Sequence, residues 1–167
     1  MGWQTRRLGD DGSPKFIASP DFPKDRTLYG YAPTANGVCV LMEAMLSKVR
    51  HQHHGPPIVS TCGASITEVQ QRLLAKYDHV ISFLDNDKAG YEALEGKRND
   101  KGVLTTPGLG DTVGRSVRLS VVENPYDAAP SDMDDRTYLG LLAKPVPYAP
   151  WHRPSYPVPS GQPPRAD

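Results

Sequence analysis

The sequence has few cysteines, no excess of charge of either sign and no long hydrophobic run. Its two cysteines among 167 residues cannot build a disulfide framework or a four-cysteine zinc module, and this usage suits a reducing cytosol. No apolar run approaches the roughly 20 residues of a membrane-spanning helix, and the N-terminus lacks a signal-peptide-like stretch, so neither a membrane span nor export is expected. The 19 basic and 19 acidic residues balance, which argues against an overall nucleic-acid-binding field but not against a local one.

Proline, in contrast, is concentrated at one end of the chain. Eight of the 17 prolines lie in residues 144–167, which predicts an extended, mostly disordered tail outside the core. A tail that docks in an SH3-like groove is the alternative to a plain solvated tail. Residues 1–36 are polar and loop-rich and are interpreted as an N-terminal extension, so one domain is expected over residues 37–143.

Within this domain, apolar runs and helical patterns alternate. The strands are predicted at residues 38–42, 58–62, 80–84 and 117–122, and the helices at 44–49, 68–77, around 91–95 and at 136–142. Thr67 is the expected N-cap of the second helix, and residues 96–114 are expected to be a loop. Strands that alternate with helices predict βαβ units and a mainly parallel sheet of about four strands, which is an α/β fold.

Acidic side chains follow three of the predicted strands. Glu43 follows the first strand, Asp85 and Asp87 follow the third, and Asp132 comes after the fourth. Because the carboxyl ends of parallel strands meet at one edge of the sheet, these carboxylates are expected to converge. Converging carboxylates repel each other unless a cation neutralises them, and Mg²⁺ is a cation that prefers oxygen ligands.

Two other interpretations of residues 85–90 are available. Asp85 and Asp87 could serve only as turn and helix-capping residues, because aspartate favours both positions. A calcium loop of the EF-hand type fails on its own pattern, since Ala89 and Gly96 stand where oxygen ligands belong.

Several blocks, in the right order, resemble the Toprim domain of bacterial-type (DnaG-like) DNA primases over residues 6–142. The strongest is the Asp-x-Asp-x-x-Gly pattern of residues 85–90, in a chain that otherwise reads as alternating strands and helices. The other blocks are residues 11–20, 22–24 and 28–30 ahead of the first strand, 40–44, 60–67 with Gln70, and 130–132. The resemblance implies a Toprim (Rossmann-like) fold in which helices flank the sheet.

The resemblance also implies roles for the matched residues. Glu43, Asp85 and Asp87 would be catalytic, and Mg²⁺, with Mn²⁺ as an alternative and no zinc, would be held by Glu43, Asp85, Asp87 and Asp132. Lys15 and Lys24 would contact the phosphates of the template or the nascent strand. The implied reaction is nucleotidyl transfer, in which ribonucleotides are joined into an RNA primer on single-stranded DNA during replication.

Some positions depart from the primase pattern. Ser47 stands where many primases have an aspartate, Ala129 stands where the last acidic motif begins, and Asp127 lies two residues from Ala129. The zinc-binding module, the basic subdomain and the helicase-docking domain of such primases have no counterpart in the sequence. Our hypothesis is therefore a split, phage-encoded primase in the host cytoplasm, with the missing parts on a separate chain and a replicative helicase as a further partner.

Two other functions compete with primer synthesis. A Toprim nuclease would use the same acids to hydrolyse phosphodiesters, although the Lys15 and Lys24 blocks belong to primases. A non-catalytic subunit would only bind DNA or a replication partner, which the departures at Ser47 and Ala129 favour. A topoisomerase is disfavoured, because nothing resembles the tyrosine domain that cleaves DNA.

The remaining candidates have structural interpretations. Residues 51–54 (His-Gln-His-His) could chelate a metal, but a solvated loop is preferred. Residues 108–114 fail the phosphate-loop spacings, so a flexible connection is expected. Cys39 and Cys62 are expected in strands as small core residues. The basic side chains that either line a nucleic-acid groove or form a solvated face are Lys97, Arg98, Lys101, Arg115 and Arg118.

Overall fold

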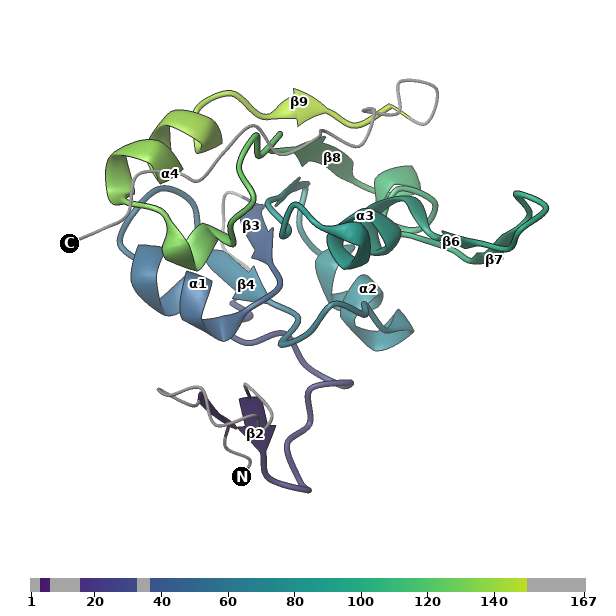
Figure 1. The fold of residues 1–167 in the computed structure, drawn as a ribbon, viewed down its shortest axis with the longest axis horizontal. Coiled ribbons are helices and arrows are strands. Elements are labelled where there is room, and N and C mark those ends of the chain that lie inside the picture. The colour runs from purple at the N-terminus through teal and green to yellow at the C-terminus, as the bar shows by residue number, and fades with distance from the viewer. Residues whose placement is uncertain (1–3, 7–15, 33–36, 150–167) are drawn as a thin grey trace.

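The computed structural model describes residues 4–6, 16–32 and 37–149, which form a sheet with helices on both faces (Figure 1). The elements in chain order are β1 (Gln4–Arg6), β2 (Phe16–Ala18), β3 (Val38–Met42), α1 (Met45–His51), β4 (Ile58–Ser60), α2 (Glu68–Leu74), β5 (His79–Ser82), α3 (Lys88–Glu95), β6 (Lys97–Arg98), β7 (Leu104–Thr106), η1 (Val113–Arg115), β8 (Arg118–Val121), η2 (Pro130–Asp132), α4 (Asp135–Leu142) and β9 (Val146–Pro147).

The central sheet has five strands in the order β4-β3-β5-β8-β9. The pairs β3–β4, β3–β5 and β5–β8 are parallel, and only β9 runs antiparallel to its neighbour. This arrangement confirms the predicted α/β class, because each parallel pair needs a crossover that places a helix on one face. The carboxyl ends of β3, β4, β5 and β8 consequently share one edge of the sheet.

Alternate residues of the strands divide the core into two clusters, one on each face. The first cluster contains Leu41 of β3 and Val80 of β5 and is covered by Leu74 of α2 and Leu94 of α3. The second is built from the other face of the same strands and is closed by α4; its buried members are Val40, Met42, Ile58, Ile81, Phe83, Val122, Met133, Tyr138 and Leu142. Strands buried on both faces explain the continuous apolar runs in the sequence.

Local signals in the sequence set several element boundaries. β3 covers the predicted residues 38–42. Thr67 is the N-cap of α2 in a reciprocal capping box with Gln70, which confirms the predicted start, but the helix ends at Leu74 rather than at residue 77. β4 ends at Ser60, so Cys62 lies after the strand and not within it. Both Cys62 and Cys39 are nonetheless buried, as expected.

Two segments expected to lack regular structure contain strands. Within residues 96–114, β6 and β7 form an antiparallel hairpin and η1 follows it. Residues 146–147, which we assigned to the tail, form β9 and pair with β8, and Tyr148 packs against the first core cluster. Proline is compatible with this place because an edge strand leaves one row of backbone groups unpaired. The rest of the predicted tail, from residue 150, lies outside the described residues.

Candidate active site at the edge of the sheet

The acidic residues Glu43, Asp85 and Asp87 lie at the carboxyl ends of two adjacent strands. Glu43 follows the last residue of β3 directly, and Asp85 and Asp87 come after β5. Leu41 of β3 pairs in register with Ser82 of β5, so the two acidic segments leave the sheet side by side. The structure thus places these three residues at the shared edge that the strand pattern predicts.

The carboxylates of Asp85 and Asp87 affect the pKa of Glu43. Burial raises the pKa of Glu43 most, and the negative charges of Asp85 and Asp87 raise it further, from 4.5 to about 7. A carboxylate is affected in this way only when like charges lie close to it in a poorly solvated place. Asp85 and Asp87 are therefore near enough to Glu43 for their charges to affect it, while their convergence on one cation stays a prediction.

The backbone of Glu43 is fixed by the loop that follows β4. The hydroxyl of Ser60 donates a hydrogen bond to the carbonyl oxygen of Glu43 at 2.7 Å. The same hydroxyl accepts a hydrogen bond from the backbone N–H of Cys62 at 3.1 Å. Cys62 has a φ of +59°, a left-handed conformation that is uncommon for residues other than glycine and is often found at functional sites. Glu43, Cys62 and Gly63 line one small cavity of about 80 Å³.

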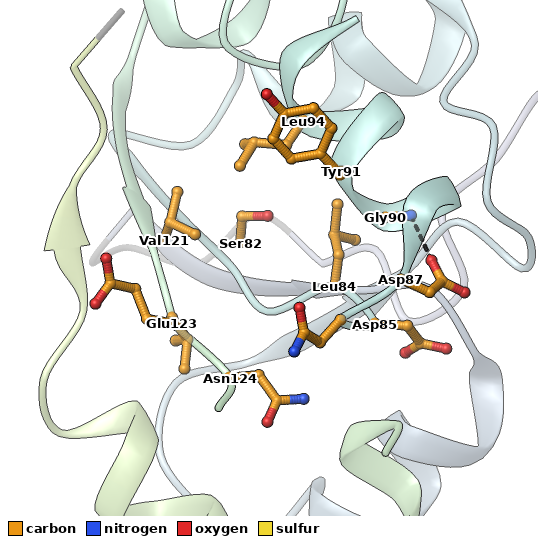
Figure 2. Close-up of a pocket in the computed structure, with 12 residues that line it drawn as sticks. Ser82, Leu84, Asp85, Asp87, Gly90, Tyr91, Leu94, Val121, Glu123 and Asn124 are labelled. Carbon is orange, nitrogen blue, oxygen red and sulfur yellow. Dashed lines mark hydrogen bonds between the residues drawn. The ribbon is translucent and has the colours of Figure 1, made fainter. Parts of the chain in front are cut away.

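Asp87 has a capping role as well as a place in the acidic group. Its Oδ1 accepts a hydrogen bond from the backbone N–H of Gly90 at 2.8 Å, which makes it the N-cap of α3 (Figure 2). A Cβ at Gly90 would lie 2.1 Å from the carbonyl oxygen of Asp85, so only glycine allows this tight turn. The cap uses one of the two carboxylate oxygens of Asp87. The capping interpretation is thus correct and compatible with a metal role.

A cavity of about 70 Å³ opens beside these acids (Figure 2). The carboxylates of Asp85 and Asp87 lie on one side of it, and Glu123 lies on the other. The wall between them is made largely of apolar side chains such as Leu84, Leu94 and Val121. Asp85 and Asp87 therefore border a space that has room for a few water molecules and a partly apolar wall.

The donor set fits a hard divalent cation. All three groups at this edge offer carboxylate oxygens, which Mg²⁺ and Mn²⁺ accept. As placed, no three histidine, cysteine, aspartate or glutamate side chains among the described residues are close enough together to ligate one ion. Mg²⁺ is commonly bound by one or two carboxylates and retains several waters, so a set of this kind fits it without direct chelation by three side chains.

Residues of α1 fix the backbone on both sides of Asp132. It is the last residue of η2 and is solvent-exposed. Arg50 Nε of α1 donates to the carbonyl oxygen of Met133 at 3.0 Å, and His51 Nε2 lies 2.8 Å from the carbonyl oxygen of Pro130. Asp132 is not among the charges that raise the pKa of Glu43. Its metal role stays a prediction.

Lys24 lies near the Glu43 end of the site. Its positive charge is one of the influences that lower the pKa of Cys62, although burial dominates and raises that pKa overall. Cys62 borders the same cavity as Glu43, so Lys24 approaches the acidic edge from the N-terminal segment. Lys15, the other predicted nucleic-acid contact, lies outside the described residues.

Gln70 connects the turn that contains Lys24 to the loop after β4, a role that we did not predict. Its side-chain amide donates to the carbonyl oxygens of Lys24 at 2.6 Å, Thr27 at 3.0 Å and Thr61 at 3.0 Å. Its Oε1 accepts the backbone N–H of Thr67 at 3.0 Å. Gln70 is 1% exposed. The only sequence signal was its place three residues after Thr67, which marks a capping box but not the distant partners.

Asn124 plays a similar part on the other side of the acids and was also missed. Its amide donates to the carbonyl oxygen of Ala128 at 2.8 Å, and its Oδ1 accepts the backbone N–H of Tyr126 at 3.0 Å. Asn86, between the two aspartates, donates to the carbonyl oxygen of Tyr126 at 3.3 Å. The available signal was a polar residue three positions after the end of β8.

The expectation of a solvated loop at residues 51–54 is wrong for His51. This residue is the last of α1, is fully buried and stacks on Tyr138 with ring centroids 3.9 Å apart. Its Nδ1 lies 3.3 Å from Asp135 Oδ1, and His54 Nε2 lies 3.2 Å from the other oxygen of that carboxylate. The fold brings in an acid that is distant in sequence, so His51 ties α1 to η2 and α4.

Comparisons with known proteins agree with this geometry. Residues 40–101 match the protein family described as Toprim-like. The DNA primase of Aquifex aeolicus (strain VF5) is 31% identical over 105 residues, which cover 57% of this chain and 21% of that primase. The crystal structure of the Aquifex aeolicus primase (zinc-binding and RNA polymerase domains) matches 88% of this chain and 37% of its own with a TM-score of 0.65 at 24% identity.

The chain has a Toprim fold. A second solved structure, the DnaG primase catalytic domain bound to single-stranded DNA, superposes on 87% of this chain and 48% of its own with a TM-score of 0.61 at 22% identity. The Toprim match includes Glu43, Asp85 and Asp87, and the primase similarities are those expected of a DnaG-like Toprim domain. The chain spans about a fifth of the length of the curated primase. No helix in the described segments combines the length and apolar character needed to cross a membrane.

Proposed function

We propose that this chain is the catalytic Toprim part of a DNA primase, which joins ribonucleotides into an RNA primer on single-stranded DNA with Mg²⁺. The observation that supports this most strongly is the position of Glu43, Asp85 and Asp87 at the carboxyl ends of two paired parallel strands, where burial and the two aspartates raise the pKa of Glu43. Like charges gathered at the edge of a sheet cost stability, so a ligand that neutralises them is the simplest reason for their presence. The similarity to DnaG-type primases selects nucleotidyl transfer among the reactions that such a site could support.

In this proposal the chain's own residues position the cation, and Glu43 can carry a proton. Asp85 and Asp87, fixed by the turn at Gly90, and Glu43, fixed by Ser60, would hold the cation, with Asp132 as a further ligand. The cation would neutralise the triphosphate and acidify the attacking 3′-hydroxyl. Without the cation the pKa of Glu43 lies near 7, so binding of the cation near neutral pH would release a proton from Glu43.

Lys24 and Lys15 would contact the phosphates of the template or the nascent strand. Lys24 is exposed at a turn whose backbone Gln70 anchors, and its charge acts on Cys62, which lines the cavity next to Glu43. Contacts of this kind are independent of base sequence and weaken as the salt concentration rises.

The proposal includes a second component. The zinc-binding module and the basic subdomain of a bacterial-type primase would come from a separate chain, in a split and phage-encoded enzyme that acts in the host cytoplasm with a replicative helicase. The chain's match to only 21% of the Aquifex aeolicus primase supports the need for further parts. Co-purification with the product of a neighbouring gene, and recovery of primer synthesis on mixing, would test it. No association and no recovery would contradict it.

Primer synthesis by the assembled enzyme tests the catalytic role. Asp85→Asn should reduce the incorporation of labelled ribonucleotides on single-stranded DNA by about 10²-fold or more, because it removes charge stabilisation at the reacting phosphates. Asp78→Asn is the matched control, since this exposed aspartate precedes the other end of the same strand, β5. Full activity of Asp85→Asn would favour the non-catalytic subunit, and DNA scission without ribonucleotides would favour the nuclease.

A further inference from the structure

The β6–β7 hairpin is an ordered arm with no role in the core. Asn99 closes its turn: Oδ1 accepts the backbone N–H groups of Lys101 at 3.1 Å and Val103 at 3.0 Å. At its base, Gly96 has a φ of +83°, and a Cβ there would lie 2.5 Å from the carbonyl oxygen of Thr106. The hairpin therefore leaves α3 in a fixed direction and projects from the body of the molecule (Figure 1).

The exposed side chains of the hairpin carry positive charge. Residues 97–106 contain three basic residues and one acidic residue, Asp100, which gives a net charge of +2. Lys97, Arg98 and Lys101 are all exposed, and the hairpin also exposes Val103 and two threonines. A projecting, ordered element with this composition is more typical of phosphate binding than of core packing.

The base of the hairpin borders a large cavity that reaches Lys24. This cavity of about 420 Å³ is lined by Lys24 and Lys97, by the loop from Gly63 to Ile66 and by one side of α3. Gly63 also lines the small cavity around Glu43. Gly63 is therefore the residue that the two cavities share, and a path from the acidic edge past Lys24 to the hairpin would run along it.

We propose that the β6–β7 hairpin binds the sugar–phosphate backbone of single-stranded nucleic acid and extends the path that passes Lys24. The inference rests on the proposed function only in taking a nucleic-acid strand as the ligand of the acidic edge.

The contacts that these side chains already make leave them able to bind phosphate. Lys97 Nζ lies 3.6 Å from Glu92 Oε2, and an exposed ion pair of this kind is worth only about 0–1 kcal/mol. Arg98 Nη1 donates to the carbonyl oxygen of Gly102 at 3.0 Å, which uses one of the five N–H donors of the guanidinium. A phosphate oxygen can replace Glu92 as the partner of Lys97, and it can bind the remaining N–H donors of Arg98.

Binding of a fluorescein-labelled oligothymidylate of about 20 nucleotides, followed by anisotropy in EDTA at several salt concentrations, tests the proposal. The test variant of the full chain removes three charges from the hairpin: Lys97→Gln, Arg98→Gln and Lys101→Gln. The matched control removes three exposed charges elsewhere: Lys76→Gln, Arg136→Gln and Lys144→Gln.

We expect the hairpin variant to bind about 10- to 100-fold more weakly at low salt and to reduce the slope of log K against log salt by about 2, since single strands contribute about 0.7 per charge. The control should keep its slope and lose less than about threefold. Equal losses in the two variants would overturn the proposal, because net charge alone would then explain binding. Unchanged binding of the hairpin variant would overturn it too.

Two further measurements keep the test decisive. If the triple variant does not melt at the wild-type temperature, Lys101→Glu at the exposed turn replaces it, with Lys144→Glu as its control. Binding in EDTA is measured without catalysis, so the two proposals can fail separately. If the hairpin variant binds normally and Asp85→Asn loses primer synthesis, only the hairpin proposal is rejected. Loss of binding by the hairpin variant with full activity of Asp85→Asn would reject only the primase assignment.

Discussion

The two faces of the central sheet bury polar groups in different ways. On the face covered by α2 and α3, the buried amide of Gln70 has partners for both its oxygen and its nitrogen. On the face covered by α1 and α4, the hydroxyls of Ser47 and Tyr138 are buried and lack a hydrogen-bond partner within the described residues. His51 is buried beside them and stacks on Tyr138.

This difference separates two uses of a buried polar side chain. Gln70 joins loops that are far apart in sequence, so its hydrogen bonds contribute both stability and the placement of Lys24. Ser47 contributes neither, and His51 contributes in a manner that depends on its protonation. The α2/α3 face should therefore be sensitive to the loss of hydrogen bonds, and the α1/α4 face should be sensitive to pH.

Replacement of Gln70 should have the largest effect on stability. Gln70→Leu keeps the volume but leaves the carbonyl oxygens of Lys24, Thr27 and Thr61 without their donor, which we expect to lower the free energy of unfolding by about 2–3 kcal/mol. Urea denaturation measures this loss. Gln71→Leu, at the neighbouring half-buried position, should cost less than about 1 kcal/mol. Similar losses in the two variants would remove the distinction between the faces.

The acidic edge where the two faces meet should respond to pH and to Mg²⁺. The pKa of Glu43 is raised to about 7, so the folded chain retains a proton that the unfolded chain loses near 4.5, and this stabilisation is lost as the pH rises through about 7. In EDTA at about pH 8, the free energy of unfolding of Glu43→Gln should therefore be about 1–2 kcal/mol higher than that of the wild type, after allowance for the partial exposure of Glu43.

Calorimetry with and without Mg²⁺ extends this prediction. The ion should raise the melting temperature of the wild type more than that of Glu43→Gln, since the ion neutralises a charge that the variant lacks. An equal rise in both proteins would show that Glu43 takes no part in binding it.

The α1/α4 face should lose stability in acid. Burial lowers the pKa of His51, and the charges of Arg50 and His54 lower it further. The hydrogen bond to the Pro130 carbonyl and the charge of Asp135 raise it, but the net shift is downward. The unfolded chain then binds the proton first as the pH falls below 6.5, so stability decreases toward acid by at most about 1.4 kcal/mol per pH unit. His51→Phe, which retains the stacking on Tyr138, should flatten the pH dependence of urea unfolding between about pH 5 and 7. An unchanged slope would mean that the pKa of His51 is the same in the folded and unfolded chains.

Removal of the Ser47 hydroxyl should have the smallest effect. Ser47→Ala leaves no new group unsatisfied, because the hydroxyl has no partner in the described part of the chain, so the free energy of unfolding should change by less than about 0.5 kcal/mol or rise slightly. Thermal melting measures this change. A loss above about 1 kcal/mol would instead show that the hydroxyl donates a hydrogen bond in solution.

Much of the fold follows from local signals in the sequence. The apolar run at residues 38–42 predicts β3, and Thr67 predicts the start of α2. The placement of Glu43, Asp85 and Asp87 at one edge also follows, because the carboxyl ends of parallel strands share an edge. These features depend on periodicity and chain direction, which a sequence carries directly.

The features that we missed depend on distant partners. β6 has two residues and shows no alternation, and β9 lies between prolines, so neither gives a strand signal. The burial of His51 depends on Tyr138, which lies 87 residues further along the chain. Gln70 reaches carbonyl groups more than 40 residues away. Such contacts arise only once the helices pack.

Helix α1 connects two acids that otherwise belong to separate segments. It begins two residues after Glu43, and its final residues, Arg50 and His51, bond to the backbone on both sides of Asp132. With seven residues, it is a strut about 10 Å long. A substitution in α1 that removes these two bonds would therefore change where Asp132 lies relative to Glu43.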